Sequence, residues 1–295
     1  VLACVGAASF LYMGINFENL VAQAGNYTSI DIAVAMIAIV ILFEACRRVV
    51  GIPILVVVGL FILYAYFGAS IPGYFGHRGF GLERIATHLY FTTEGIIGTP
   101  LAVCSTFIFL FILFGAFLER TGIGQFFIDI ANAIAGKATG GPAKVAVISS
   151  ALQGTITGSS VANTVGSGSF TIPMMKRMGY RPEFAAAVEA AASTGGQIMP
   201  PIMGAAAFLM AEYMGITYAQ VALMAILPAV LYFGGIFMSV HLEAKKLGLT
   251  GIPKELLPQF RQLMKRSFLL LPLIILVCLI ATNSMTIQRS AVLAI

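Results

Sequence analysis

Apolar runs of nearly bilayer length constrain this chain more than any other feature of its sequence. We take the following ranges as candidate spans: 1–14, 29–46, 52–67, 99–118, 143–175, 183–211, 218–240 and 267–282. A helix needs about 20 mainly apolar residues to cross a hydrocarbon core of roughly 30 Å. The composition agrees, because only 10% of the residues are charged, against about 25% in soluble domains. We predict an all-α polytopic membrane protein, which excludes most cytosolic enzymes and every folded secreted module.

The charged residues and cysteines suggest neither a nucleic-acid partner nor a metal site. The net charge is +5, but the basic residues form short clusters between apolar runs, as topology signals do. The four cysteines lie in or at the ends of apolar runs without CxxC spacing, so we read them as small core residues. The three histidines are far apart in sequence and show no ligand spacing. We expect no cofactor and no catalytic residue.

The range 143–175 is too long for one simple crossing. A straight helix of 33 residues would be about 50 Å long. Its middle, 154–163 (GTITGSSVAN), is rich in glycine and hydroxyl residues, which weaken a helix. The break leaves two arms of about 22 Å each, and each is too short to cross comfortably. The range therefore reads as a hairpin that enters the membrane and returns on the same side.

The distribution of basic residues favours this re-entrant hairpin over a single crossing. With Arg47 and Arg48 cytoplasmic, a hairpin leaves only Arg78, Arg84 and Arg289 outside. Fourteen basic residues are then inside: Arg47, Arg48, Arg120, Lys137, Lys144, Lys176, Arg177, Arg181, Lys245, Lys246, Lys254, Arg261, Lys265 and Arg266. A single crossing would leave 6 inside and 11 outside, against the positive-inside rule.

Three further segments are predicted to connect the spans. In 121–136, Phe126, Phe127, Ile130 and Ile134 recur at helical spacing, as in an interfacial amphipathic helix. Residues 69–95 read as a polar external connection. Residues 242–266 form the longest cytoplasmic loop, where two prolines argue against a continuous helix.

A second break interrupts 183–211 at Gly195, Gly196, Gln197, Ile198, Met199, Pro200 and Pro201. Proline lacks an N–H and clashes with the carbonyl of residue i−4. Pro200 should therefore free the carbonyl of Gly196, and Pro201 that of Gln197. Broken helices are where secondary transporters place coupling ions and substrate. The alternative is a proline kink that only serves packing.

Polar side chains gather at both breaks. The hairpin tip carries Thr157, Ser159, Ser160 and Asn163, whose oxygens could replace water around a sodium ion. Before the second break, Glu189, Ser193 and Gln197 recur every four residues, so we expect Glu189 to face the interior or a cavity. Glu189 could equally be a structural hydrogen-bonding residue. Gly166, Ser167 and Gly168 are read as positions of close helix packing.

The run from Phe114 to Pro201, above all GTITGSSVANTVGSGSFTIPMMKRMGYRPEFAAAVEAAASTGGQIMPP, resembles the large membrane subunit of tripartite ATP-independent periplasmic (TRAP) transporters. The stretch EAAASTGGQIMPPIMGAAAFLMAEYMG resembles the fused small/large permeases that work with TAXI-type periplasmic binding proteins. Residues 96–295 look like the first part of the large-subunit transport region. Residues 1–95 look like the end of the small-subunit region and its connection.

This resemblance implies a sodium-driven elevator importer of organic acids in a bacterial or archaeal inner membrane. It also implies that the chain carries the first of two inverted repeats. Because the chain starts at Val1 within one apolar run and stops at Ile295 as another begins, we expect a fragment whose partners include the rest of the permease. Membrane lipid and a periplasmic binding protein would be further partners.

By position, the family's ion and substrate motif falls on two sets of residues. They are Thr157, Gly158, Ser159, Ser160, Ala162 and Asn163 at the tip, and Ser193, Thr194, Gly195, Gly196 and Gln197 up to Pro200 and Pro201 at the break. Sodium ligands are expected from Ser159, Ser160, Asn163, Gly196 and Gln197. The family pattern has an aspartate at the position of Asn163 and a neutral residue at that of Glu189, so the charge at this site stays open.

Two other functions are compatible with parts of this sequence. A binding-protein-independent, ion-coupled carboxylate carrier would share the hairpin architecture. An intramembrane serine protease would use serines such as Ser159 or Ser167, but it needs a histidine or lysine base within hydrogen-bond reach. No such base is evident in the core spans, since His241 lies at a cytoplasmic end.

Overall fold

The computed structural model describes residues 2–23, 25–253, 255, 257–258, 260–282 and 285–294. All regular structure in these ranges is helical, which confirms the all-α class. The chain divides into two compact units, Val1–Ala102 and Val103–Ile295, and each is described by itself. Lys254, one of the basic residues used for the topology, lies outside the described residues, as does the side chain of Arg261.

The first unit is a small helical cluster. Its elements are α1 (Leu2–Ile15), α2 (Phe17–Ala22), α3 (Ser29–Val49), α4 (Ile52–Phe67), the 3-10 turn η1 (Gly68–Ser70) and α5 (Leu82–Phe91). Helix α3 starts with a capping box, in which the Thr28 side chain accepts from the Asp31 N–H and the Asp31 carboxylate accepts from the Thr28 N–H. Helix α3 packs on α1 and α5, with Ala35, Ala38 and Tyr90 buried. Helix α5 lies within 69–95, for which the sequence predicted only a connection.

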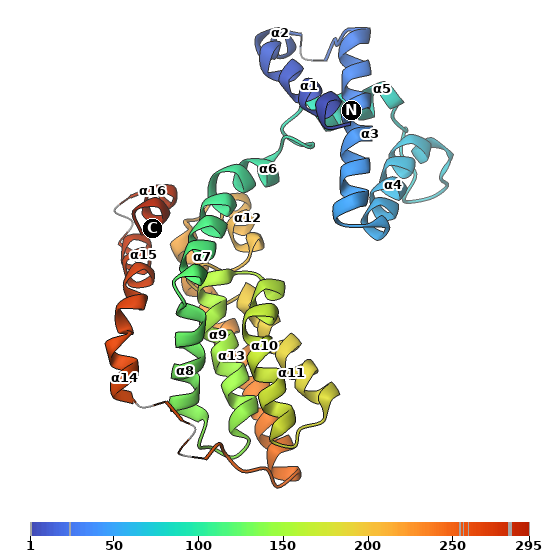
Figure 1. The fold of residues 1–295 in the computed structure, drawn as a ribbon. Coiled ribbons are helices and arrows are strands. Elements are labelled where there is room, and N and C mark those ends of the chain that lie inside the picture. Colours follow the sequence, from blue (N-terminus) through green and yellow to red (C-terminus); the bar gives the residue numbers. More distant parts are fainter. Residues whose placement is uncertain are drawn as a thin grey trace. The chain divides into compact units, whose positions relative to one another are not determined.

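The second unit carries both predicted breaks. The elements from residue 99 on are α6 (Thr99–Val103), a π-helical segment η2 (Cys104–Ile108), α7 (Phe109–Arg120), α8 (Ile123–Ala135), α9 (Gly141–Thr157), α10 (Ser160–Arg177), α11 (Pro182–Thr194), η3 (Gly195–Gln197), α12 (Ala205–Met214), α13 (Tyr218–Lys246), α14 (Phe260–Lys265), η5 (Ser267–Leu270), α15 (Leu271–Ala281) and α16 (Ile287–Ala294). Figure 1 shows α8 to α11 and α13 packed as neighbours.

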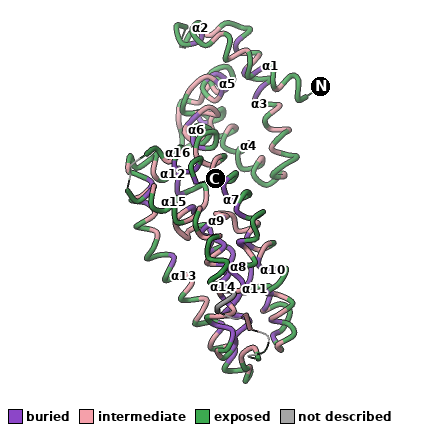
Figure 2. Tube along the Cα trace, turned by 60° about the vertical axis from the view of Figure 1, so that its left-hand side comes forward, coloured by how far each residue is buried: buried purple, intermediate pink, exposed green. Residues whose placement is uncertain are grey.

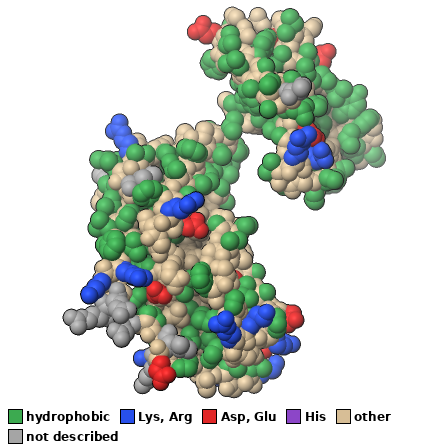
Figure 3. Space-filling view, in the orientation of Figure 1, with side chains coloured by type: hydrophobic (Ala, Val, Ile, Leu, Met, Phe, Trp, Pro, Cys, Tyr) green, Lys and Arg blue, Asp and Glu red, His purple; other side chains and the backbone are tan. Residues whose placement is uncertain are grey.

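Four helical stretches of the described chain are long and apolar enough to cross a membrane. They are Ser29–Val49, Ile52–Ser70, Thr99–Arg120 and Tyr218–Lys246. Large apolar side chains such as Leu223, Leu227 and Leu231 of α13 are exposed, and Figure 3 shows hydrophobic side chains over much of the visible surface. Apolar surface of this extent is typical of a protein that meets lipid. The chain is therefore a multi-pass membrane protein.

Helices α9 and α10 form an antiparallel pair whose outer ends lie together. The hydroxyl of Tyr180, which follows α10, donates to the carbonyl of Gly140 before α9 at 3.5 Å. The Nζ of Lys144 lies 5.1 Å from the ring centroid of Phe237 on α13. The basic residues near the start of α9 and the end of α10 thus share one end of this unit. That arrangement fits a hairpin, and its re-entrant placement in a membrane stays a prediction.

Helix α8 buries some, but not all, of the apolar side chains that the sequence places on one face. Phe126, Phe127 and Ala131 are buried where α8 packs on α9 and α7, but Ile134 is 69% exposed. At about 100° per residue, Ile134 lies only about 20° from Phe127 around the helix, on the same side as the two phenylalanines, but near the end of α8. The four apolar residues therefore share one side of α8, as the sequence predicts, and the interfacial placement of this helix stays a prediction.

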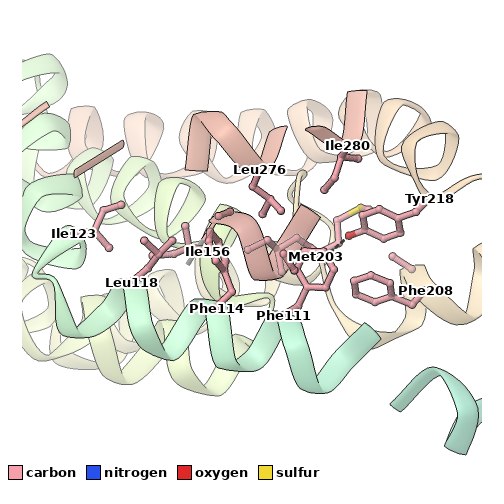
Figure 4. Close-up of a cluster of buried hydrophobic side chains, with 14 of the residues drawn as sticks. Phe111, Phe114, Leu118, Ile123, Ile156, Met203, Phe208, Tyr218, Leu276 and Ile280 are labelled. Carbon is pink, nitrogen blue, oxygen red and sulfur yellow. Dashed lines mark hydrogen bonds between the residues drawn. The ribbon is translucent and has the colours of Figure 1, made fainter. Parts of the chain in front are cut away.

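A buried apolar cluster surrounds the place where both breaks occur. Figure 4 shows Phe111, Phe114 and Leu118 of α7 pointing toward Ile156 of α9 and Met203. Phe208 of α12 stacks on Tyr218 of α13, with ring centroids 4.4 Å apart. Figure 2 shows that buried residues concentrate along α8 to α11. The cluster holds the hairpin and the broken helix in one packed body.

Candidate functional site

The hairpin break lies at Gly158 and Ser159. Helix α9 ends at Thr157, and Gly158 has a φ of 58°, in the left-handed region that favours glycine. Ser159 begins α10 as its N-cap, and its Oγ accepts from the Ala162 N–H at 3.3 Å. A Cβ on Gly158 would lie 2.0 Å from the carbonyl oxygen of Met203, so only glycine lets the two segments approach.

The second break is held by a tyrosine that the sequence did not single out. After α11, η3 is followed by Pro200 and Pro201, which are joined by a cis peptide bond, and α12 begins at Ala205. The Tyr218 hydroxyl donates to the carbonyls of Pro201, at 2.8 Å, and of Ile202. No local sequence pattern marks Tyr218, because its partners lie 16 and 17 residues away.

The prediction of two unpaired carbonyls at the prolines is wrong. The carbonyl of Gly196 accepts from the Met199 N–H at 3.4 Å, and that of Gln197 accepts from the Gly204 N–H at 2.7 Å. The chain tightens into a 3-10 turn and then folds back, so new N–H donors replace those that the prolines removed. Each carbonyl still has a second lone pair, which remains able to bind a cation.

The two breaks meet directly. The Gln197 Nε2 donates to the Ser160 Oγ at 3.1 Å, which links η3 to the start of α10. Gly154 of α9 faces Gly196, where a Cβ on Gly196 would lie 3.0 Å from the Cα of Gly154 and 2.9 Å from the Nδ2 of Asn163. The structure thus brings together Gly158, Ser160 and Asn163 with Gly196 and Gln197.

Asn163 offers a buried oxygen at this contact. Its Nδ2 donates to the carbonyl of Ser150 at 2.9 Å, while its Oδ1 is buried without a hydrogen-bond partner among the described residues. Buried polar atoms are normally satisfied, so such an oxygen indicates a missing partner. A sodium ion fits this oxygen, because hard cations prefer oxygen ligands. The Thr157 Oγ1 is likewise buried and unpartnered in the described part.

Other predicted site residues are placed less favourably. The Thr194 hydroxyl is exposed and donates to the carbonyl of Ala190 within its own helix. Thr157 lines a separate cavity of about 360 Å³ between α8 and the hairpin, together with Gln153 and Ser169. Ser159 uses one lone pair of its hydroxyl oxygen for capping. Asn163 therefore offers the most available side-chain oxygen at the contact.

Glu189 lies inside the protein, surrounded by hydroxyl groups. Its Oε1 accepts from Ser150 at 3.0 Å, from Ser193 at 3.1 Å and from Ser167, and its Oε2 accepts from Thr171. This confirms its predicted interior position and the pairing with Ser193. Gln197, two turns further on, bonds to Ser160 and not to Glu189.

Three members of this group were missed from the sequence: Ser150, Ser167 and Thr171. The interpretation of Ser167 as a packing residue is wrong, because its hydroxyl bonds to Glu189, whereas a Cβ on neighbouring Gly168 would lie 2.9 Å from the Glu189 Cγ. A signal was present, since Asn163, Ser167 and Thr171 recur every four residues on α10. They form a polar stripe that matches the stripe on α11.

Comparison with known proteins shows the family. The family model described as the tripartite ATP-independent periplasmic transporter, DctM component, matches residues 37–295. The chain belongs to the DctM family. The matched range of this DctM-family chain begins at residue 37, ahead of the boundary at residue 96 that the sequence predicts for the large-subunit-like region. Members of this family are transport permeases.

Individual relatives agree. The chain is 28% identical to a C4-dicarboxylate TRAP transporter large permease protein DctM of Pseudomonas aeruginosa over 59% of the chain and 42% of that protein. It is 28% identical to the protein of the same name from Vibrio cholerae over 74% of the chain and 44% of that protein. It is 27% identical to the sialic acid TRAP transporter permease protein SiaT of Haemophilus influenzae over 56% of the chain and 27% of that protein. The DctM-family chain thus spans less than half the length of these relatives.

Proposed function

We propose that this chain is part of the membrane permease of a sodium-driven, binding-protein-dependent importer of organic acids. Family membership supports transport, and the direct contact between the hairpin tip and the broken helix supports a site at that place. The buried Oδ1 of Asn163, which has no hydrogen-bond partner in the described part of the chain, carries the sodium assignment. We assign the further sodium ligands to Ser159, Ser160 and the carbonyls of Gly196 and Gln197, which belong to the same contact between the breaks.

Sodium would supply positive charge where the described residues supply none. Neither the tip nor η3 carries a lysine, arginine or histidine. A bound cation would draw the hairpin and the broken helix together, because its oxygen ligands come from both. An anionic solute would then bind best after sodium, since the cation offsets its charge and fixes both elements. The oxygens of the chain would position the ion. The hairpin and the broken helix, which bear these oxygens, could then move as one body in an elevator mechanism.

The names of the relatives support the substrate class, and the partners are those that the sequence resemblance implies. Their printed names include C4-dicarboxylate and sialic acid, both of which are organic acids. We propose a periplasmic binding protein of the TAXI type, the remainder of a fused small/large permease and inner-membrane lipid as partners. A binding-protein-independent carboxylate carrier remains the alternative. Uptake of labelled carboxylic acids into proteoliposomes, with and without the added binding protein, separates the two.

Sodium binding can be tested without a known solute. The thermal unfolding midpoint of the purified complete permease is followed while sodium chloride replaces choline chloride at constant ionic strength. For Asn163→Ala we expect the sodium concentration at half-maximal stabilisation to rise about tenfold or more, because a hydrogen-bond-like contact to a charge contributes about 1.5 to 3 kcal/mol.

The matched control is Ser169→Ala, an exposed serine on the same helix whose hydroxyl bonds only to the carbonyl of Gly166. Its sodium dependence should equal that of the unchanged protein. Equal sodium dependence in Asn163→Ala and Ser169→Ala would place the ion elsewhere.

A further inference from the structure

Glu189 and its four hydroxyl neighbours form a closed polar group, which we call the hydroxyl cage: Ser150, Ser167, Thr171, Glu189 and Ser193. Each of the five residues has an exposed fraction of 0%. The cage joins three helices, with Ser150 on α9, Ser167 and Thr171 on α10, and Ser193 beside Glu189 on α11. On α10, Ser167 and Thr171 follow Asn163 by one and two helical turns, and both Ser150 and Ser167 hydrogen-bond with Asn163.

No basic side chain in the described part of the chain is paired with Glu189. The elements packed against α11 are α9, α10, η3 and α13. Charged residues on α9, α10 and α11 lie at least five positions along their helices from the cage: Lys144, Lys176, Arg177 and Glu183. On α13, Tyr232 contacts α11 through a hydrogen bond to the carbonyl of Ala191. The titratable residues that follow on α13 lie nine or more positions further along the helix: His241, Glu243, Lys245 and Lys246. A buried carboxylate without a countercharge is costly, so the cage needs a positive charge from outside.

Two of the hydroxyls have a choice of acceptor. The Ser167 Oγ donates either to Glu189 or to the carbonyl of Asn163 at 2.8 Å. The Thr171 Oγ1 donates either to Glu189 or to the carbonyl of Ser167 at 3.0 Å. With Glu189 ionised, both hydroxyls can donate to the carboxylate. With Glu189 protonated, its new O–H can donate to one of them, which then turns to the backbone carbonyl. Both states keep every polar group paired.

The oxygens of the cage already hydrogen-bond to one another, an arrangement that suits a proton. Ser150 Oγ lies 3.1 Å from Ser167 Oγ, and four hydroxyl oxygens lie within hydrogen-bond distance of the carboxylate. A metal ion would have to separate oxygens that already contact one another across three helices. A proton needs only a turn of two hydroxyl groups.

We propose that the hydroxyl cage is a proton-binding site of this permease, separate from the sodium site at the hairpin tip. A hydronium ion gives up a proton, a new O–H bond forms on a carboxylate oxygen of Glu189, and water is released. The hydroxyl hydrogen of Ser167 then turns to the carbonyl of Asn163. The protonation state of Glu189 thus changes a hydrogen bond of Asn163, which lies at the contact between the hairpin and the broken helix. The inference rests on the transport function of the family and not on the sodium assignment.

The test uses infrared spectroscopy on the purified complete permease in sodium-free choline buffer. Spectra in H₂O and D₂O are recorded from alkaline to acidic pH, and the C=O stretch of protonated carboxylic acids is followed. We expect a band from a buried acid that appears on acidification. Glu189→Gln, which resembles the protonated side chain in shape, should lose this band. Glu183→Gln, an exposed glutamate at the start of the same helix, should keep it.

A second variant covers the case in which Glu189→Gln does not fold. Thr171→Val keeps the volume but removes the hydroxyl that bonds to Oε2, so the band should persist at a shifted frequency. A band that is unchanged in both cage variants would overturn the proposal. So would its disappearance when sodium chloride is added at fixed pH, because sodium would then neutralise Glu189. Neither result would affect the sodium titration of Asn163→Ala.

Discussion

Gly154 and Gly196 face each other across the contact between the hairpin and the broken helix, and a Cβ on Gly154 would lie 2.5 Å from the Cα of Gly196. The neighbour is backbone and cannot turn aside as a flexible side chain would. We expect Gly154→Ala to lower the free energy of unfolding by about 1 to 3 kcal/mol, the usual cost of overpacking. The thermal unfolding midpoint of the complete permease measures it.

Gly234→Ala on α13 is the matched control, because a Cβ there meets nothing within 4 Å. Alanine is the better helix former, so this variant should be as stable as the unchanged protein or more so. Equal stability of the two variants would contradict close glycine packing at the site.

Tyr218→Phe should destabilise the second break. The lost hydroxyl leaves the carbonyls of Pro201 and Ile202 without this donor, at a cost of about 1 to 3 kcal/mol where the groups are buried. Denaturant unfolding measures the loss. Tyr213→Phe, at an exposed tyrosine of α12, is the control and should change little. If the two substitutions cost the same, the hydroxyl of Tyr218 does not hold the turn.

Gln197 and Ser160 should be energetically coupled. In a double-mutant cycle with Gln197→Ala and Ser160→Ala, we expect an interaction energy of about 0.5 to 1.5 kcal/mol, as for a single hydrogen bond. The cycle of Thr194→Ala with Ser160→Ala should give an interaction energy near zero, because the Thr194 hydroxyl bonds within its own helix. Additive effects for Gln197 and Ser160 would show that this bond does not link the two breaks.

The ends of the hairpin should lie on the same side of the membrane. In a background without the four native cysteines, Lys137→Cys and Arg177→Cys at exposed positions should both react only with cytoplasmic thiol reagents. Arg78→Cys should react only from outside. If positions 137 and 177 reacted from opposite sides of the membrane, the segment between them would cross the membrane once and would not be a re-entrant hairpin.

The helices and both breaks could be predicted because their signals are local. The glycine at position 158 and the proline pair at 200 and 201 act on their own turns, and the apolar runs need only composition. The partners at the site could not be predicted in the same way. The rule for proline states which hydrogen bonds are lost, but the N–H that replaces one of them belongs to Gly204, whose position depends on how the chain turns back.

The hydroxyl cage shows the same limit. The stripe on α11 correctly placed Glu189 inside, but which turns of α9 and α10 face it depends on how the three helices pack. Ser150 lies on α9 and is 39 residues from Glu189 in the sequence. Only the periodic hydroxyls of α10 could have been found, by applying to that helix the spacing test used on α11.

The close approach of Gly158 to the Met203 carbonyl shows which positions at the site tolerate substitution and which do not. Main-chain atoms of Gly158 and Met203 form this junction, so it does not depend on the identity of the neighbouring side chains. The side chains of Ser159 and Ser160 add a cap on α10 and a bond to Gln197, so exchanging them would remove those two bonds but leave the main-chain junction in place. The close approach of the two segments thus depends on one position, which has to stay glycine whatever side chains surround it.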